Sequence, residues 1–449
     1  MGQVIIEITD MIWGLPLLIL LIGGGIFFFF FSGLAPFRHI KHAIQILLGR
    51  FDDPDDPGDI NHYQALSTAL ASTIGMGNIS GVAIAIATGG PGAMFWMWVS
   101  AFFGMATKFF TCTLAVMYRK KDEKNELQGG PMYVITEGLG KGWKPLAIFF
   151  SLAGMIGVLP LFQVNQFTQA VRDLFLIPAG IIDATSINVI IGLLLAGTSA
   201  VVIFGGIRRI GKVVGRMVPI MVIIYFLIVM IILMISPTEI LPAFKSIFMD
   251  AFSGNAVLGG ALGQLVIIGV RRGTFSNEAG IGTAPMAHSA AKTKEPVREG
   301  LVAMVGPAID TLVVCTLTAL AIIITGVWVN PQTDGITLTA EAFENALPGF
   351  GTYLLMLCVL FFALTTLFAF PYYGTKCFAF VFGAKYKKLY NYIYLVGIFL
   401  AAVTSLNVLI SFIDGVYALM AIPTMVSTLL LAPRVRKEFK RYFIKIRKG

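Results

Sequence analysis

The stretch Ser72-Thr73-Ile74-Gly75-Met76-Gly77-Asn78 lies in the middle of an apolar segment that runs from about Leu66 to Thr88. Two glycines two positions apart weaken a helix there, because each Gly costs ~1 kcal/mol of helix propensity relative to Ala. We therefore expect a short unwound piece of backbone near the middle of a membrane. Such backbone is tolerated at that depth only where protein buries it or where it lines a cavity. A discontinuous helix that offers free N–H and C=O groups halfway across a bilayer suits a small zwitterion and a companion cation.

The composition is that of a polytopic membrane protein. Hydrophobic residues make up 57% of the 449 residues, charged residues make up 13%, and the mean hydropathy is +0.84. These values exclude a soluble globular domain. The four cysteines lie in apolar stretches without paired spacing, which argues against a disulfide framework or a zinc site. The first apolar run follows an acidic leader without the basic region of a signal peptide, so we expect a retained first helix.

Runs of about 20 apolar residues predict about eleven transmembrane helices in an all-α fold. The expected spans lie near 11–34, 62–88, 92–118, 145–171, 186–205, 215–236, 255–290, 300–326, 351–380, 389–408 and 410–432. The expected divisions of the chain are an extra N-terminal helix with a cytoplasmic loop at 1–61, two five-helix groups at 62–236 and 255–432, and a basic tail at 433–449.

Lys and Arg are concentrated on one side of these spans. Most of the 33 basic residues fall in alternate loops and in the tail that begins at Arg434, whereas the opposite loops hold only Arg172 and Lys245. Because basic loops stay in the cytoplasm, we expect an N-terminus outside and a C-terminus inside the plasma membrane. The net charge of +9 then follows from topology and from attraction to anionic membrane lipid, and no nucleic-acid partner is indicated.

A second interruption lies in the span at 255–290, which is too long for one straight crossing. Its polar and Gly-rich part runs from Gly269 to Gly280. The first break falls in the second span and this one in the seventh, and an odd interval of helices reverses the direction of insertion. This pattern indicates two inverted five-helix repeats, each of which opens with a discontinuous helix, after one extra N-terminal helix.

Four motifs give the chain a resemblance to a known family. They are Ser-Thr-Ile-Gly-Met-Gly-Asn-Ile at 72–79, Gly-Gly-Pro-Gly-Ala at 89–93, Gly-Gly-Pro-Met-Tyr at 129–133 and Phe-Ser-Asn-Glu-Ala-Gly-Ile-Gly-Thr-Ala-Pro-Met-Ala-His at 275–288. Over nearly its whole length the chain resembles the alanine or glycine:cation symporter family. The resemblance implies a LeuT-type fold and sodium-coupled uptake of glycine and alanine. At 369–374 the chain lacks a Gly-Trp pair that many relatives have, which bears on the shape of the side-chain pocket.

The unwound stretch is the expected substrate site, formed by Thr73, Gly75, Met76, Gly77 and Asn78. The N–H groups of Met76 and Gly77, at the positive end of a half-helix dipole, suit a carboxylate. The alternative is that the glycines only permit close helix packing. Asn78 would present its carbonyl oxygen to a cation or to the substrate amine, or would bond to a neighbouring helix.

Further residues are expected around the same substrate. Phe275 and Phe370 are placed at the apolar end of the pocket by the resemblance, although either could be a packing residue. Gln163 is a polar residue on the fourth span that could bind the amine or the carboxylate. Ser276 and Asn277 have a direct role or, together with the acidic residue that follows them, cap the second half of the broken helix.

Thr365 and Thr366 supply two neutral hydroxyl oxygens in the middle of the ninth span, as a weakly held alkali cation requires. Threonines in membrane helices commonly bond back to their own helix, but this pair matches the cation-site helix that the resemblance implies. We therefore expect a sodium ion bound by Thr365, Thr366 and the main-chain carbonyls of Ala71 and Ile74. Thr366 is also expected to contact the substrate.

Arg271 and Arg272 are costly inside a membrane and should pair with an acid or line water. Glu278 and Asp310 are the acids available in the neighbouring sequence. The alternative is that both arginines interact with the carbonyl groups and dipole at the end of the outer half-helix.

The function expected from the sequence is import of glycine and alanine, and of D-alanine as a further candidate, coupled to sodium by alternating access. A proton-coupled rival would titrate Glu278 or Asp310 in a low-dielectric setting. A membrane-embedded enzyme would need a nucleophile with its base, a metal cluster or a nucleotide-binding domain, and the sequence shows none of these patterns. A channel is also disfavoured, because two broken helices that meet at one site are better suited to an occluded binding site than to an open pore.

Overall fold

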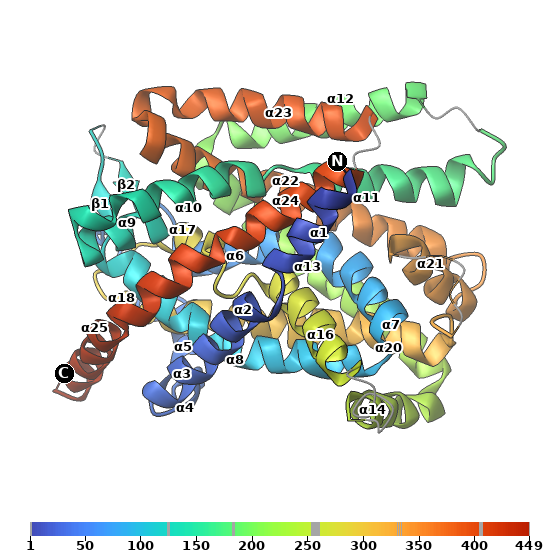
Figure 1. The fold of residues 1–449 in the computed structure, drawn as a ribbon, viewed down its shortest axis with the longest axis horizontal. Helices are drawn as coiled ribbons and strands as arrows, with labels where there is room; N and C mark the ends of the chain where they lie inside the picture. Colours follow the sequence, from blue (N-terminus) through green and yellow to red (C-terminus); the bar gives the residue numbers. More distant parts are fainter. Residues whose placement is uncertain are drawn as a thin grey trace.

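The computed structural model describes residues 2–123, 126–181, 185–252, 261–329, 331, 333, 335–403 and 407–448. These residues form helices almost throughout, and one antiparallel hairpin joins β1 (Lys120–Lys121) to β2 (Leu127–Gln128) (Figure 1). Large apolar side chains are exposed on the outside of the helices, for example Leu194 at 64% and Leu227 at 54%. Exposed apolar surface of this kind marks the part of a protein that contacts a membrane.

The helices of the first half of the chain are α1 (Gly2–Ile12), α2 (Leu15–Leu18), η1 (Ile19–Gly23), α3 (Gly24–Phe31), α4 (Ala35–Arg38), α5 (Ile40–Leu47), α6 (His62–Thr73), η2 (Gly77–Gly81), α7 (Val82–Gly89), α8 (Gly92–Met117), α9 (Pro131–Tyr133), η3 (Val134–Leu139), η4 (Lys141–Trp143), α10 (Lys144–Gly157), α11 (Leu161–Val171), η5 (Arg172–Leu176), α12 (Thr185–Ile203) and α13 (Gly206–Ile235). Those of the second half are α14 (Pro237–Ala251), α16 (Ala261–Asn277), α17 (Thr283–His288), α18 (Pro296–Ala303), α19 (Val305–Pro307), η6 (Ala308–Cys315), α20 (Thr316–Thr325), α21 (Gly335–Ala346), α22 (Gly351–Phe382), η7 (Ala384–Tyr386), α23 (Lys387–Val403), α24 (Asn407–Leu419) and α25 (Ala421–Lys448).

Eight helical segments among the described residues are long and apolar enough to cross a membrane, or nine if α6 and η2–α7 together make one span. Of the other spans expected from the sequence, α16 and α23 have 17 residues each. This length is just short of the ~20 residues that a straight crossing needs. The adjoining residues 253–260 and 404–406 lie outside the described part. The all-helical, multi-pass architecture is therefore confirmed, while the number of eleven spans and the inverted repeat remain predictions.

One boundary expected from the sequence was wrong. The basic residues from Arg208 to Arg216, expected in a loop, form the first turns of α13, which begins at Gly206. The physical reason is helical periodicity, since Ile210, Val214 and Val218 are buried at intervals of four residues on one face of this helix. The basic side chains therefore extend a membrane helix beyond its apolar part.

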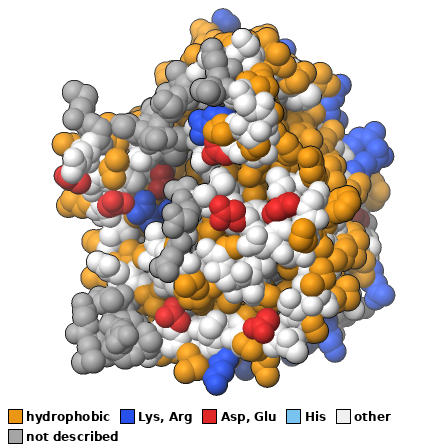
Figure 2. All heavy atoms as spheres, turned by 90° about the vertical axis from the view of Figure 1, so that its right-hand side faces the viewer, with side chains coloured by type: hydrophobic (Ala, Val, Ile, Leu, Met, Phe, Trp, Pro, Cys, Tyr) orange, Lys and Arg blue, Asp and Glu red, His pale blue; other side chains and the backbone are white. Residues whose placement is uncertain are grey.

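The two ends of the molecule differ in their charged side chains. In Figure 1, α25, the β1–β2 hairpin and α18 lie at the left, whereas α14 and α21 lie at the right. Figure 2 looks onto the right-hand end, where Asp and Glu side chains are spread over the centre and most of the basic side chains in view lie at the edges. The basic tail and the hairpin thus lie at the end opposite α14 and α21. Basic residues are enriched on the cytoplasmic side of membrane proteins, so this arrangement is the one expected if the left-hand end is cytoplasmic.

The basic tail is bound to the left-hand end of the molecule. Arg441 and Lys445 of α25 both contact the carboxylate of Glu295, at 2.7 Å in the case of Lys445. Burial opposes ionisation of Glu295, but the bonds from Lys445 and Arg441 outweigh it and hold the pKa of this carboxyl below its ordinary value. Since Glu295 immediately precedes α18, these contacts link the end of α25 to the start of α18.

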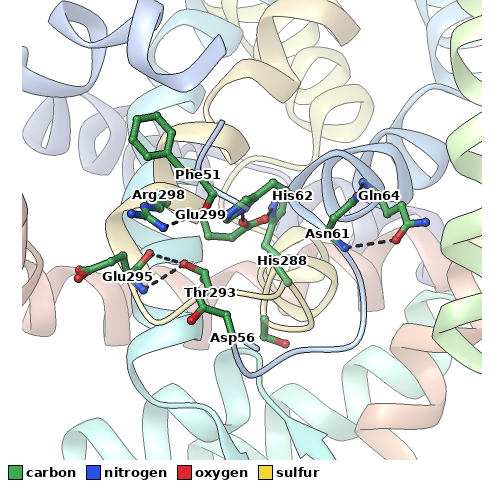
Figure 3. Close-up of polar contacts among 12 residues, drawn as sticks. Phe51, Asp56, Asn61, His62, Gln64, His288, Thr293, Glu295, Arg298 and Glu299 are labelled. Carbon is green, nitrogen blue, oxygen red and sulfur yellow. Dashed lines mark hydrogen bonds and ion pairs between the residues drawn. The ribbon is translucent and has the colours of Figure 1, made fainter. Parts of the chain in front are cut away.

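A buried carboxylate ties the start of α6 to α17 and α18 (Figure 3). Glu299 is fully buried, and its two oxygens contact Nδ1 of His62 and Nδ1 of His288, the latter at 2.6 Å. The backbone adds to the connection, because Ile60 and Ala291 form a parallel bridge beside these side chains. One carboxylate therefore holds three segments together that are far apart in the sequence.

We expect Glu299→Ala to lower the stability of the protein by about 3–5 kcal/mol, because removal of one partner leaves the other members of a buried ionic cluster uncompensated. Thermal unfolding of the purified protein in detergent, followed by tryptophan fluorescence, measures the loss. Glu137→Ala is the control, since Glu137 pairs with Lys120 at an exposed position and exposed pairs contribute about 0–1 kcal/mol. Similar melting temperatures for the two variants would contradict the assignment.

Candidate functional site

The chain bends sharply between α6 and η2. α6 ends at Thr73, Ile74 is extended with φ −75° and ψ 93°, and η2 begins at Gly77. The segments on the two sides of this break are inclined to each other by 55°. A Cβ atom on Gly75 would lie 2.7 Å from Oγ1 of Thr366 on α22. Only glycine therefore allows α22 to approach the break so closely.

At the break, the N–H groups of Gly75 and Asn78 do not make their usual helical hydrogen bonds. Oδ1 of Asn78 accepts a hydrogen bond from the N–H of Gly75 at 2.9 Å, and the backbone N–H of Asn78 donates to the carbonyl of Gly75 at 3.1 Å. In an uninterrupted helix these N–H groups would bond to the carbonyls of Ala71 and Ile74. Both carbonyls thus lose their helical donors. The carbonyl oxygen of Asn78, expected to face a cation or the substrate amine, is occupied by the backbone instead.

A cavity of about 200 Å³ lies beside the break. The residues expected at the substrate site that line it are Thr73, Gly75, Met76, Gly77, Gln163, Phe275 and Phe370. Since Met76 and Gly77 open the half-helix that follows the break, their N–H groups have no acceptor within that helix. The cavity therefore has donors and a helix N-terminus on one wall, which favours a carboxylate.

Gln163 of α11 lines the same cavity and carries a buried acceptor. The side chain is only 8% exposed, and its Oε1 has no hydrogen-bond partner among the described residues. A buried acceptor that is left unpaired costs about 1–3 kcal/mol. A ligand that donates a hydrogen bond, such as an ammonium group, would remove this penalty.

Aromatic rings enclose the apolar part of the cavity. The ring of Phe275 packs edge-on against Phe162 at 5.6 Å and against Tyr417 at 6.1 Å. Phe370 of α22, which is 5% exposed, also lines the cavity. Two phenylalanine rings therefore form part of the cavity wall.

Four residues expected at the substrate do not line this cavity. They are Asn78, Ser276, Asn277 and Thr366. Asn78 and Ser276 donate at 2.8 Å each to the two carboxylate oxygens of Asp310, which is fully buried. Asn277 donates to the hydroxyl of Thr311 at 3.3 Å. Three of the four thus form a polar cluster around Asp310, behind the cavity wall.

The capping role considered for Ser276 and Asn277 was wrong. Both residues belong to the end of α16, and α17 begins only at Thr283, with Gly282 as its N-cap residue and without a side-chain cap. The reason is the conformation of the intervening turn, in which Glu278, Gly280 and Gly282 have φ values of 55°, 90° and 113°.

Glu278 is the one residue of this turn that has a left-handed conformation without being glycine. Its Oε2 accepts hydrogen bonds from the hydroxyls of Ser72 at 3.2 Å and Thr283 at 2.5 Å, and the residue lines the cavity. Such backbone strain is found where the surroundings fix a residue for function. The carboxylate therefore contacts both breaks, which sequence reasoning did not foresee.

The partners expected for Arg271 were also wrong. Its guanidinium donates to Asp10 of α1 at 2.7 Å and to Asp414 of α24 at 3.1 Å, and it lies 5.6 Å from the ring of Trp13. Glu278 was expected because it is near in sequence, but it lies beyond the end of α16, whereas Arg271 lies on the face of α16 next to α1 and α24. Arg271, Arg272 and Asp414 also line the cavity.

The residues expected to bind sodium offer two hydroxyl and two carbonyl oxygens, and sodium binding by them remains a prediction. Thr365 and Thr366 are buried and donate to carbonyls one turn earlier in α22, at 3.0 Å in each case. A hydroxyl that donates in this way still has lone pairs to offer as an acceptor. Thr366 lies against Gly75, and the carbonyls of Ala71 and Ile74 have lost their helical donors. Unwound carbonyls of this kind bind sodium in discontinuous-helix transporters.

Known proteins resemble this chain over nearly its whole length. Residues 1–449 match the sequence profile of the sodium:alanine symporter family. The chain is 41% identical to the sodium/alanine symporter AgcS of Methanococcus maripaludis, over 98% of this chain and 97% of that protein. It is 33% identical to a probable sodium/glutamine symporter, GlnT of Bacillus subtilis, over 96% of this chain and 89% of that protein.

A solved structure has a similar fold. The crystal structure of MhsT in complex with L-phenylalanine superimposes with a TM-score of 0.61 at 12% sequence identity, and the match covers 84% of this chain and 89% of MhsT. MhsT has the LeuT fold. The similarity therefore supports the LeuT-type architecture that the sequence motifs implied.

Proposed function

The chain belongs to the sodium:alanine symporter family, and from that premise we propose that it imports glycine and alanine together with sodium by alternating access. It is a transporter and not an enzyme. We place the N-terminus outside and the C-terminus in the cytoplasm, so that α14 and α21 face outward and the basic tail faces inward. D-alanine is a further proposed substrate.

The observation that carries this proposal is the lining of the small cavity at the break. The N–H groups of Met76 and Gly77 suit the substrate carboxylate, and the unpaired Oε1 of Gln163 suits its ammonium group. The volume of about 200 Å³ is below the ~300–1,000 Å³ of pockets for drug-sized ligands. A zwitterion with a very small side chain meets all three conditions.

Closure toward the outside would use Arg271. Its contacts with Asp10 and Asp414 connect α16 to α1 and α24 beside the cavity that Arg271 and Asp414 line. Outward opening would require these charge-assisted bonds to break, and inward opening would leave them in place. The extra N-terminal helix would in this way take part in closing the site.

Uptake is expected to require sodium, and Thr366→Val is expected to weaken the binding of sodium. The change keeps the shape of the side chain and removes one hydroxyl ligand, so the sodium concentration for half-maximal uptake should rise about tenfold, the effect of ~1.4 kcal/mol. Alanine uptake into proteoliposomes under an imposed sodium gradient measures it. Thr352→Val, on the same helix but bound to Glu344 at the half-buried start of that helix, is the control.

The same assay separates sodium coupling from proton coupling. Uptake that runs equally well in sodium-free buffer under a proton gradient would refute the proposal and favour titration of Glu278 or Asp310. An unchanged sodium dependence in Thr366→Val would place the cation elsewhere.

A further inference from the structure

A second cavity, of about 420 Å³, lies toward the end of the molecule that carries the β1–β2 hairpin. It is lined by residues that precede α6, by the junction of α12 and α13, and by parts of β2, α22 and α23. The residues of α22 in its wall are Pro371, Tyr372, Thr375, Lys376 and Ala379. Since Phe370 lines the central cavity, one helix borders both cavities.

Along α22, Tyr373 lies between Phe370, which lines the central cavity, and Lys376, which lines the second one. Lys376 lies six residues after Phe370, which is about 9 Å along an α-helix. Between them Tyr373 is fully buried, and its hydroxyl donates to Ser72 at 3.2 Å and to the carbonyl of Thr68 at 3.4 Å. Ser72 lines the central cavity, and Asp59, just before α6, lines the second one. Separation of α6 from α22 at Tyr373 would thus join the cavities.

Lys376 is the unusual group in the second cavity. It is 4% exposed, and its Nζ donates to two neutral oxygens, the carbonyl of Leu127 and Oε1 of Gln128, both at 3.3 Å. These distances are longer than the 2.7–2.9 Å of charge-assisted bonds. Among the described residues no carboxylate lies within 4.0 Å of it, because the acids of this cavity, Asp59 and Glu126, pair with Arg208 and Lys387.

A buried ammonium group without a carboxylate partner, facing a cavity, favours an anion as its ligand. Under the proposed function the central site binds a substrate that carries a carboxylate, and import requires this substrate to leave on the side where the second cavity lies. We propose that the second cavity is the cytoplasmic release vestibule, and that Lys376 binds the carboxylate of the amino acid there. This inference rests on the proposed function and orientation.

The test compares transport from the two faces of the membrane. Right-side-out and everted membrane vesicles from cells that express the full chain report the KM for alanine at the outer and the cytoplasmic face. Lys376→Gln should raise the cytoplasmic KM about tenfold or more, the usual effect of losing a hydrogen bond to a charged group, and should leave the outer KM within about twofold. Lys376→Arg should restore most of the cytoplasmic affinity.

Controls separate this role from a structural one. Lys385→Gln changes an exposed lysine of η7 outside the cavity and should leave both KM values unchanged. An equal change at both faces in Lys376→Gln, or no change at either, would overturn the inference. So would a changed requirement for phosphatidylglycerol with an unchanged cytoplasmic KM, since Lys376 would then bind a lipid headgroup. Wild-type vesicles that carry no alanine would refute the proposed function itself.

Discussion

Gly77→Leu is expected to abolish alanine binding in a protein that still folds. A Cβ atom at Gly77 would lie 3.5 Å from Cδ1 of Phe275, which is an ordinary van der Waals distance. The backbone at this position does not need glycine, so the first carbon is tolerated. The remaining atoms of leucine, however, would enter the cavity of about 200 Å³ and occupy the place of the substrate.

The matched variant is Gly77→Ala, which adds only the tolerated carbon and should weaken binding by about tenfold or less, the effect of ~1.4 kcal/mol or less. Binding of radiolabelled alanine to purified protein measures both variants, and size-exclusion chromatography verifies that they are folded. For Gly77→Leu we expect affinity to fall more than 100-fold, below detection. A folded Gly77→Leu protein with near-normal binding would show that the carboxylate lies elsewhere.

The main features of the site were predictable from local sequence. A pair of glycines in an apolar span placed the bend between α6 and η2, because glycine propensity acts on the residues that carry it. The same reasoning predicted that the N–H groups of Met76 and Gly77 lie at the start of the half-helix after the break. Family motifs then added Phe275 and Phe370, and the structure places both rings in the lining of the cavity.

Other features depend on contacts between distant segments. Asp10, Asp414 and Arg271 form one cluster although α1, α24 and α16 are far apart in the chain, and the nearest acid in sequence was the wrong partner. The unpaired Oε1 of Gln163 follows from packing that no periodicity reveals. One sequence signal was available, since Lys108, Arg271, Arg272 and Lys376 lie well inside expected spans. Such residues are functional candidates by default.

Substrate choice is expected to be limited by size more than by chirality. Glycine and alanine should fit between Phe275 and Phe370, whereas leucine would have to displace packed rings, at a cost of ~1 to 3 kcal/mol for modest overpacking. That cost corresponds to about a 5- to 150-fold loss of affinity. The relatives do not settle the matter by name, because GlnT is a probable glutamine symporter. The size limit on the substrate must therefore be argued from the residues that line this cavity.

Chirality should matter less because the groups that bind the substrate grip its two ends. In the proposed binding mode the break binds the carboxylate and Gln163 binds the amine, so we expect a methyl group on either side of the α-carbon to be tolerated. Competition with radiolabelled alanine by unlabelled glycine, D-alanine, valine and leucine tests both parts. Effective competition by leucine would refute the size limit, and failure of D-alanine would refute the weak chirality.

Phe370→Ala is expected to admit larger substrates, which would show that the side chain of Phe370 sets the size limit. Phe370 is 5% exposed and its ring lines the cavity, so its removal leaves space where a larger substrate side chain can lie. Leucine should then compete at least tenfold better than in the wild type, while alanine binds less tightly because its methyl group loses a packing partner. A variant that loses alanine without gaining leucine would mean that Phe370 supports the fold of α22 and does not face the substrate.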